Sequence, residues 1–178
     1  MSFLPSLPDA PLLEVLGTIP DVAGPLLDFH EALMRGPSPL TVAERELIAA
    51  YVSALNACRY CHGVHQVTAQ QFGVEEQTLA RLLEDPGSAE VDARLGALLT
   101  YVAKLTSTPA RMTASCAEAV LAAGWDEAAL RDAVAVCALF NCMNRLVDGL
   151  GITASPDYLA LAGARLGSAG YAGLKDLL

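Results

Sequence analysis

Residues 41–65, TVAERELIAAYVSALNACRYCHGVH, combine a strong helix signal with a closely spaced cysteine pair. Thr41 is followed three residues later by Glu44, and this capping box predicts that a helix begins here. The apolar residues that follow recur on one helical face: Leu47, Ile48, Tyr51, Val52 and Leu55. This helix is expected to end near Asn56, and a second one is expected from about Cys58 to Phe72.

The rest of the chain also shows helical periodicity, without the alternating pattern of strands. Further helices are expected at residues 22–34, 75–83, 91–105, 113–123, 126–150 and 156–166. Thr113 and Asp126 can act as N-caps, and Asp85–Ser88 marks a break. The pattern predicts one all-α domain with its core at about residues 22–151. Residues 1–20 and the glycine-rich segment 167–178 are expected to be peripheral, the latter partly ordered only by a partner.

Composition supports a packed helical domain. The 178 residues are 53% hydrophobic and 17% charged, which excludes disordered and fibrous classes. No stretch reaches the roughly 20 apolar residues that a bilayer span needs. The N-terminal stretch has no basic region and contains Pro5, Pro8 and Asp9, so neither a signal peptide nor a mitochondrial presequence is expected. The sequence therefore predicts a cytoplasmic protein.

The charge balance limits the partners. Twenty acidic and 11 basic residues give a net charge of -9, which excludes nucleic acid and anionic membranes as favoured partners. Several helices are apolar on more than one face, and burying that surplus predicts a homo-oligomer.

Two thiols and an imidazole converge in the second helix. Cys58, Cys61 and His65 are three and four residues apart, so their side chains lie on one helical face. Cβ atoms at such spacing are about 5 to 6 Å apart, and a disulfide needs about 3.5 to 4.5 Å. A small backbone adjustment would therefore let the pair cycle between dithiol and disulfide.

One of these thiols must ionise to react, because a free cysteine has a pKa of about 8.5. A helix N-terminus capped by Asn56 would favour Cys58, whereas His65 favours Cys61, and we prefer Cys61 as the nucleophile. Glu46 is expected to be partly buried and to orient or charge His65. Its neighbours on that face are small and would allow another helix to pack closely: Ala49, Ala50 and Ser53.

The spacing of these residues resembles a known motif. Glu46, eleven residues, Cys58-x-x-Cys61 and then His65 resemble the core of the alkylhydroperoxidase D (AhpD)-like family, within the carboxymuconolactone decarboxylase superfamily. Residues 135–151, AVCALFNCMNRLVDGLG, look like the branch described as peroxidase-related enzymes. The resemblance covers about residues 22–151.

The resemblance implies an all-helical homo-oligomer, from dimer to hexamer, that reduces organic hydroperoxides and is restored by a small dithiol or a protein reductant. It implies that Cys61 is peroxidatic, Cys58 resolving, and Glu46 and His65 a proton relay. Decarboxylases of the superfamily lack the cysteine pair, which argues against decarboxylation. One departure is that Tyr60 stands where the best-known members have a histidine. His62 follows the second cysteine instead, so either residue could join the relay.

Other interpretations of the pair remain open. A zinc site would need a fourth ligand, and the remaining histidine, His30, is expected to be a packed or surface residue. Residues 58–62, CRYCH, also match a c-type haem attachment sequence, although that chemistry normally requires export. We expect neither a metal nor a cofactor. The pair could also belong to a dithiol–disulfide oxidoreductase, or to a helical oligomer that senses redox state without turnover.

The other polar features are expected to be structural. Three cysteines on apolar helices are interpreted as small buried hydrophobes without a role: Cys116, Cys137 and Cys142. A polar stripe interrupts the long helix: Asn141, Asn144, Arg145 and Asp148. It is expected to face solvent or another subunit, with an ion pair between Arg145 and Asp148; lining an active-site cavity is the alternative.

Overall fold

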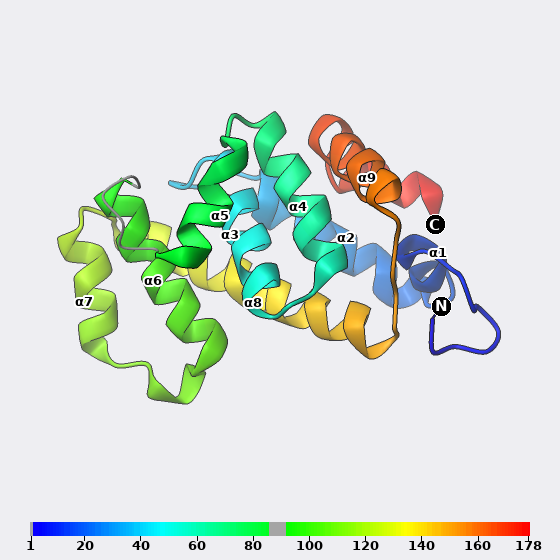
Figure 1. The fold of residues 1–178 in the computed structure, drawn as a ribbon, viewed down its shortest axis with the longest axis horizontal. Helices are drawn as coiled ribbons and strands as arrows, with labels where there is room; N and C mark the ends of the chain where they lie inside the picture. Colours follow the sequence, from blue (N-terminus) through cyan, green and yellow to red (C-terminus); the bar gives the residue numbers. More distant parts are fainter. Residues whose placement is uncertain (1, 86–91) are drawn as a thin grey trace.

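The computed structural model describes residues 2–85 and 92–178, and within these ranges it contains helices and no strand (Figure 1). The α-helices are α1 (Leu12–Gly17), α2 (Pro20–Arg35), α3 (Val42–Leu55), α4 (Arg59–Gln71), α5 (Glu76–Glu84), α6 (Ala93–Ser107), α7 (Ala114–Ala122), α8 (Glu127–Gly149) and α9 (Pro156–Ala169). Two 3-10 turns are η1 (Pro109–Arg111) and η2 (Ala172–Leu177). The predicted all-α class is confirmed. Of the predicted break, residues 86–88 lie outside the described ranges.

Helix α3 forms the centre of the fold. The predicted capping box is present, with Thr41 accepting from the Glu44 N–H and the Glu44 carboxylate accepting from the Thr41 N–H. Every residue from 45 to 53 is buried, because α4, α5, α6 and α8 all pack against this helix. Even Arg45 is enclosed, and its guanidinium donates to the Leu33 and Gly36 carbonyls. The enclosure of residues 45–53 explains how a carboxylate on α3 can be held away from water.

A tight turn between α3 and α4 places the cysteine pair. Ala57 has a φ of 58°, in the left-handed region that costs a non-glycine residue about 1 to 2 kcal/mol. The Cys58 N–H donates to the Ser53 carbonyl at 2.9 Å, which closes the turn. Asn56 caps the C-terminus of α3. It does not cap α4, which was one possibility from the sequence, because Cys58 itself is the N-cap residue of α4. Both thiols thus lie in the first turn of α4.

Glycines let α9 approach α4 closely. A Cβ on Gly63 of α4 would lie 2.8 Å from Leu159, and one on Gly163 of α9 would lie 2.7 Å from the Val64 carbonyl oxygen. The end of the Leu159 side chain could shift to admit a Cβ at position 63, but the Val64 carbonyl is backbone, so position 163 requires glycine. The close approach brings one face of α9 over the cysteine-bearing helix.

The predicted helix starts are largely confirmed. Asp126 caps α8 by accepting from the Ala129 N–H. Thr113 occupies the N-cap position of α7, but its hydroxyl contacts Ser115 and Cys116 in place of a backbone N–H. The local pattern therefore located the helices, while the side-chain contacts at their ends depend on neighbouring residues.

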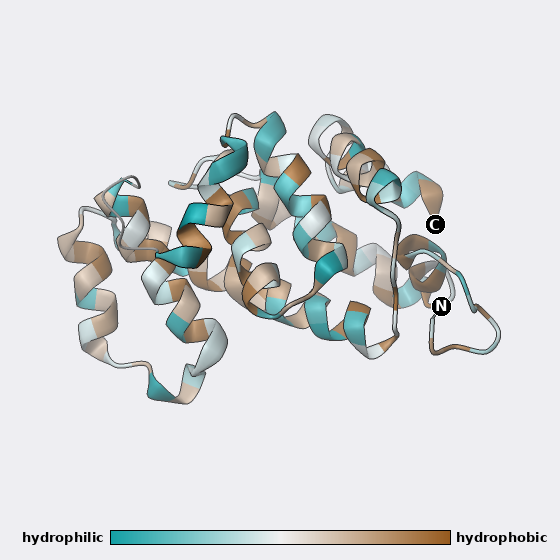
Figure 2. Cartoon of the chain, viewed as in Figure 1, coloured by the Kyte–Doolittle hydropathy of each residue, from teal (hydrophilic) through white to brown (hydrophobic). Residues whose placement is uncertain are grey.

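Both terminal segments fold back onto the body of the protein. Their ends lie together beside α1, which is mostly hydrophobic in composition (Figures 1 and 2). Tyr171 is buried, and its backbone N–H donates to Glu31 at 2.8 Å. The C-terminal segment contacts α2 and the core within the chain itself, while its partial ordering by a partner stays a prediction.

In the part of the chain that the structure describes, none of the helices is long and apolar enough to cross a membrane.

Candidate active site

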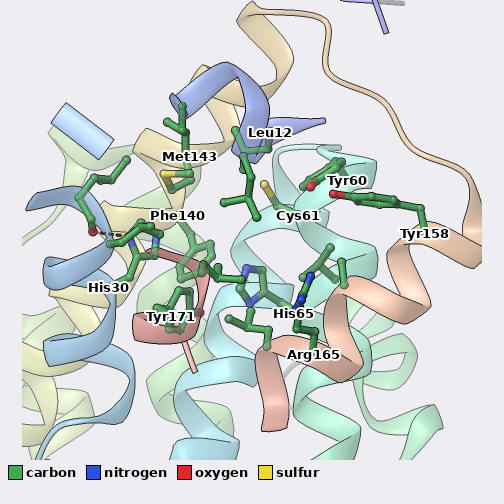
Figure 3. Close-up of a pocket in the computed structure, with 18 of the residues that line it drawn as sticks. Leu12, His30, Tyr60, Cys61, His65, Phe140, Met143, Tyr158, Arg165 and Tyr171 are labelled. Atoms are coloured by element: carbon green, nitrogen blue, oxygen red, sulfur yellow. Dashed lines mark hydrogen bonds between the residues drawn. The ribbon is translucent and has the colours of Figure 1, made fainter. Parts of the chain in front are cut away.

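A cavity of about 140 Å³ lies between α1, α2, α4, α8 and α9 (Figure 3). Its lining is mainly apolar. The residues are Leu12, Leu13, Leu16, Leu26, Leu27, His30, Tyr60, Cys61, Val64, His65, Phe140, Met143, Tyr158, Leu161, Ala162, Arg165, Leu166, Tyr171 and Leu174. Cys61 and His65 therefore border the same space, whereas Cys58 is not part of the lining.

The two thiols of the pair contact each other in the reduced form. Cys58 is fully buried and Cys61 nearly so. The contact with the Cys61 thiol lowers the pKa of Cys58, and the Cys61 backbone acts in the same direction. The hydrogen bond with Cys58 and burial raise the pKa of Cys61. This order is the reverse of the one that the position of His65 suggested.

Access and acidity thus favour different sulfurs. Cys58 is the more acidic thiol, but it is enclosed behind the cavity wall. Cys61 is protonated in the resting pair and borders the cavity. A substrate in the cavity can reach only Cys61, so a base must remove the Cys61 proton as the sulfur reacts.

His65, which lies one helical turn after Cys61 on α4, can act as that base. The Nδ1 of His65 lies 2.7 Å from the Glu46 Oε2, as the sequence predicted from the small residues flanking Glu46. Because the carboxylate can only accept, Nδ1 carries the hydrogen and Nε2 is the ring nitrogen left for the cavity. The ring is held edge-on against Phe140, with centroids 4.4 Å apart.

Glu46 is more deeply buried than expected, with no exposed surface. Burial acts to raise its pKa, but the His65 ring and the Arg35 guanidinium outweigh burial and hold the pKa below its ordinary value. Arg35 donates to Oε1 at 2.6 Å, and the Tyr171 hydroxyl donates to the same oxygen at 3.2 Å. The carboxylate is therefore ionised at neutral pH and fixed from three sides.

Tyr171 and Arg35 were not predicted as site residues. The Arg35 guanidinium lies 5.1 Å from the Tyr171 ring centre, and burial and the neighbouring Glu46 raise the pKa of Tyr171. Tyr171 comes from the segment expected to be peripheral, and no local pattern marks its partner 125 residues away. An aromatic residue within a glycine-rich tail was the only available signal.

His30 also belongs to the cavity. It is buried, and its Nδ1 donates to the Leu26 carbonyl at 2.8 Å. Burial lowers its pKa to about 4, despite the hydrogen bond, so the ring is neutral at neutral pH. It packs on Tyr171 with centroids 5.0 Å apart. The expectation of a packed residue is confirmed, but sequence reasoning missed its place in the cavity wall.

Of the two residues flanking Cys61, Tyr60 borders the cavity and His62 does not. Tyr60 lines the cavity, and burial together with Tyr158 raises its pKa. His62 lies outside the lining, with its Nδ1 3.3 Å from the Ala50 carbonyl of α3. Tyr60 is therefore the flanking residue that can touch a substrate.

The polar stripe of α8 lies behind the thiol pair. Asn144 is buried, donates to Ser53 at 3.0 Å and accepts from Asn56 at 2.9 Å. Asn144 also acts to lower the pKa of Cys61, against its net rise, and Asp148 acts to raise the pKa of both thiols, against the net fall at Cys58. The expectation of a solvent-facing or subunit-facing stripe is wrong for Asn144, because the α3–α4 turn covers it.

Arg145, also part of the polar stripe, makes contacts other than the ion pair with Asp148 that the sequence suggested. It is exposed and donates to the carbonyl and side-chain oxygens of Asn141. Arg145 thus interacts with the previous turn of α8, where the sequence suggested an ion pair with Asp148.

The three cysteines outside the pair differ in how deeply they are buried. Cys137 is buried, as expected, but Cys142 is exposed and Cys116 half-buried, so the prediction is wrong for these two. Lys104 lies 3.0 Å from the Cys116 sulfur, and together with Thr113 it lowers the pKa of that thiol to about 7. Helix α7 buries only Val120, which explains why its cysteine stays near the surface.

Across residues 2–85 and 92–178, no three His, Cys, Asp or Glu side chains are placed together to hold a metal ion. The chemistry that the site itself offers is an accessible thiol, a second thiol in contact with it, and an imidazole on a buried carboxylate. This set can transfer protons and form a disulfide.

The chain is similar to a known protein family and to solved structures. Residues 20–104 match the model of the carboxymuconolactone decarboxylase family, and the match includes Glu46, both thiols and His65. A peroxidase-related protein from Silicibacter sp. TM1040 is similar in structure, with a TM-score of 0.76 and 26% identity over 83% of this chain and 78% of that one.

A second solved structure is described as an alkylhydroperoxidase AhpD core, an uncharacterized peroxidase-related protein from Ralstonia eutropha JMP134. It has a TM-score of 0.75 and 26% identity, over 84% of this chain and 78% of that one. No curated protein matches the sequence at a significant level.

Proposed function

We propose that this chain is a thiol peroxidase that reduces organic hydroperoxides, because residues 20–104 match the carboxymuconolactone decarboxylase family and the fold is similar to that of peroxidase-related, AhpD-like proteins. The observation that carries the proposal is that Cys61 and His65 line one apolar cavity while His65 is bound to Glu46. An accessible thiol next to a positioned base is what a nucleophilic attack on an O–O bond requires.

In the first step, the Cys61 sulfur attacks the terminal oxygen of the hydroperoxide and the O–O bond breaks. The Nε2 of His65 accepts the thiol proton and returns it to the leaving alkoxide, so that an alcohol and a Cys61 sulfenic acid form. The buried Glu46 carboxylate stabilises the transient imidazolium. The raised pKa of Cys61 makes this proton transfer part of the attack.

In the second step, the Cys58 sulfur attacks the Cys61 sulfenic sulfur, and water leaves as the disulfide forms. Cys58 suits this role because its pKa is lowered and it already contacts Cys61. An external small dithiol or protein dithiol then supplies two electrons and two protons, and restores both thiols.

The proposal is tested by steady-state consumption of cumene hydroperoxide with dihydrolipoamide or dithiothreitol as reductant. We expect sustained turnover that Cys61→Ser abolishes. Cys142→Ser is the matched control, because Cys142 is an exposed thiol outside the cavity and should leave the rate unchanged.

The same assay separates the alternatives. A single oxidation per chain without further consumption would indicate a redox-sensing oligomer and overturn the proposal. Disulfide exchange with dithiols but no hydroperoxide consumption would indicate a dithiol–disulfide oxidoreductase, which would also overturn it.

A further inference from the structure

We infer that the cavity selects hydroperoxides that carry a carboxylate on an apolar body, and that Arg165 binds the carboxylate. This inference rests on the proposed peroxidase function for its substrate, and it adds the chemical class of that substrate. It is carried by the composition of the cavity and by the position of one cation within it.

The cavity offers a mainly apolar surface. Eight leucines line this cavity, from α1, α2, α9 and η2: Leu12, Leu13, Leu16, Leu26, Leu27, Leu161, Leu166 and Leu174. Such a lining removes an alkyl chain from water, so each buried methylene tightens binding by about fourfold. Hydrogen peroxide and other small polar peroxides would gain nothing from it.

Arg165 is the one arginine or lysine in this lining, and no Asp or Glu accompanies it. It lies one turn after Leu161 on the face of α9 that also carries Tyr158 and Ala162. Leu161 and Arg165 are both exposed, so the cavity opens to solvent along this face.

The guanidinium of Arg165 is free to bind a ligand. Within the described residues it has no hydrogen-bond or ion-pair partner, in contrast to Arg35, which Glu46 neutralises. A free guanidinium presents paired donors that match the two oxygens of a carboxylate. Because the protein has a net charge of -9, a local cation is needed for an anionic substrate to stay at this opening.

Kinetics with a matched substrate pair test this inference. We expect a fatty-acid hydroperoxide to have a kcat/KM about three- to tenfold above that of its methyl ester, the range of a partly exposed charge pair. Arg165→Gln should abolish the difference by slowing the acid alone, and Arg165→Lys should retain part of it. Arg131→Gln, which removes an exposed charge outside the cavity, should preserve the difference.

Equal kcat/KM values for acid and ester in the wild type, with sustained turnover of both, would overturn the inference and leave the peroxidase function standing. An acid preference that survives Arg165→Gln would also overturn it.

A binding measurement without peroxide chemistry separates the two proposals. We expect calorimetry to show that octanoate binds more tightly than octanol, and that Arg165→Gln removes this advantage. If that holds while no hydroperoxide is consumed, the carboxylate site is supported and the peroxidase function is overturned. If octanoate binds equally to wild type and Arg165→Gln, the carboxylate site is overturned whatever the turnover.

Discussion

The Glu46 Oε2 on α3 lies 2.7 Å from the His65 Nδ1 on α4, and both residues are buried. A carboxylate in a water-free environment is costly unless it is paired and hydrogen-bonded. Here Arg35 pairs with the second oxygen. The carboxylate can therefore stay charged where it orients His65 and stabilises a proton on it.

Glu46→Gln keeps the shape of the side chain and removes its charge. We expect the peroxide step to slow by roughly ten- to thousandfold, because His65 loses the carboxylate that stabilises its protonated form. The free energy of unfolding should fall by about 3 kcal/mol, since Arg35 is left without its charge partner. The measurement is single-turnover oxidation of Cys61 by hydroperoxide, at a temperature where melts show a folded protein.

Glu44→Gln is the control, because glutamine can replace glutamate in the capping box and the residue lies outside the cavity. If Glu46→Gln leaves the rate unchanged while His65→Gln slows it, Glu46 is a structural residue and the relay ends at His65.

Tyr171→Phe tests the third contact of the same carboxylate. The hydroxyl donates to Glu46 Oε1 at 3.2 Å, so its loss should lower the free energy of unfolding by about 1 kcal/mol. We expect a smaller kinetic effect than that of Glu46→Gln, because Arg35 and His65 still hold the carboxylate. Urea unfolding and the same single-turnover assay measure both. A rate loss as large as that of Glu46→Gln would mean that Tyr171 acts on the substrate directly.

His30 should make the protein less stable in mild acid. Its pKa is about 4 in the folded chain, against 6.5 for the ordinary group, so the unfolded chain binds the proton more readily. Stability is complete above pH 6.5 and falls as the pH drops toward 4, by about 2 kcal/mol between pH 7 and pH 5. Urea unfolding at both pH values should show that His30→Gln loses this part of the pH dependence. An identical pH dependence in the variant would contradict the assigned neutral state.

An exposed apolar face predicts self-association. Ile19, Val22 and Phe29 recur at helical spacing along α2 and are 43%, 55% and 50% exposed. We expect light scattering to give a multiple of 18.6 kDa, and Phe29→Glu to shift the protein to smaller species. A monomer across micromolar concentrations would contradict this expectation.

Local signals explain which parts of the fold could be predicted. The capping box at Thr41 and Glu44 and the spacing of Cys58, Cys61 and His65 depend on neighbours within one or two turns. The contact of His65 with Glu46 could be predicted as well, because the two helices are joined by a short turn.

The other residues of the site could not be predicted, because their partners are distant in sequence. Tyr171 reaches Glu46 across 125 residues, and Asn144 reaches Ser53 across 91. His30 joins the cavity only once α1, α8 and η2 pack against α2. The order of the two thiol pKa values follows first from the hydrogen bond between the thiols and then from burial, and the sequence specifies neither.

The central claim is that Cys61 attacks the hydroperoxide and Cys58 resolves the product. The most direct test is mass spectrometry of the Cys58→Ser variant after one equivalent of cumene hydroperoxide, with dimedone present to trap sulfenic acid. The account predicts a dimedone adduct on Cys61 in this variant and a Cys58–Cys61 disulfide in the wild type. An adduct on Cys58 in the Cys61→Ser variant, with none on Cys61 in Cys58→Ser, would contradict the account and reverse the two roles.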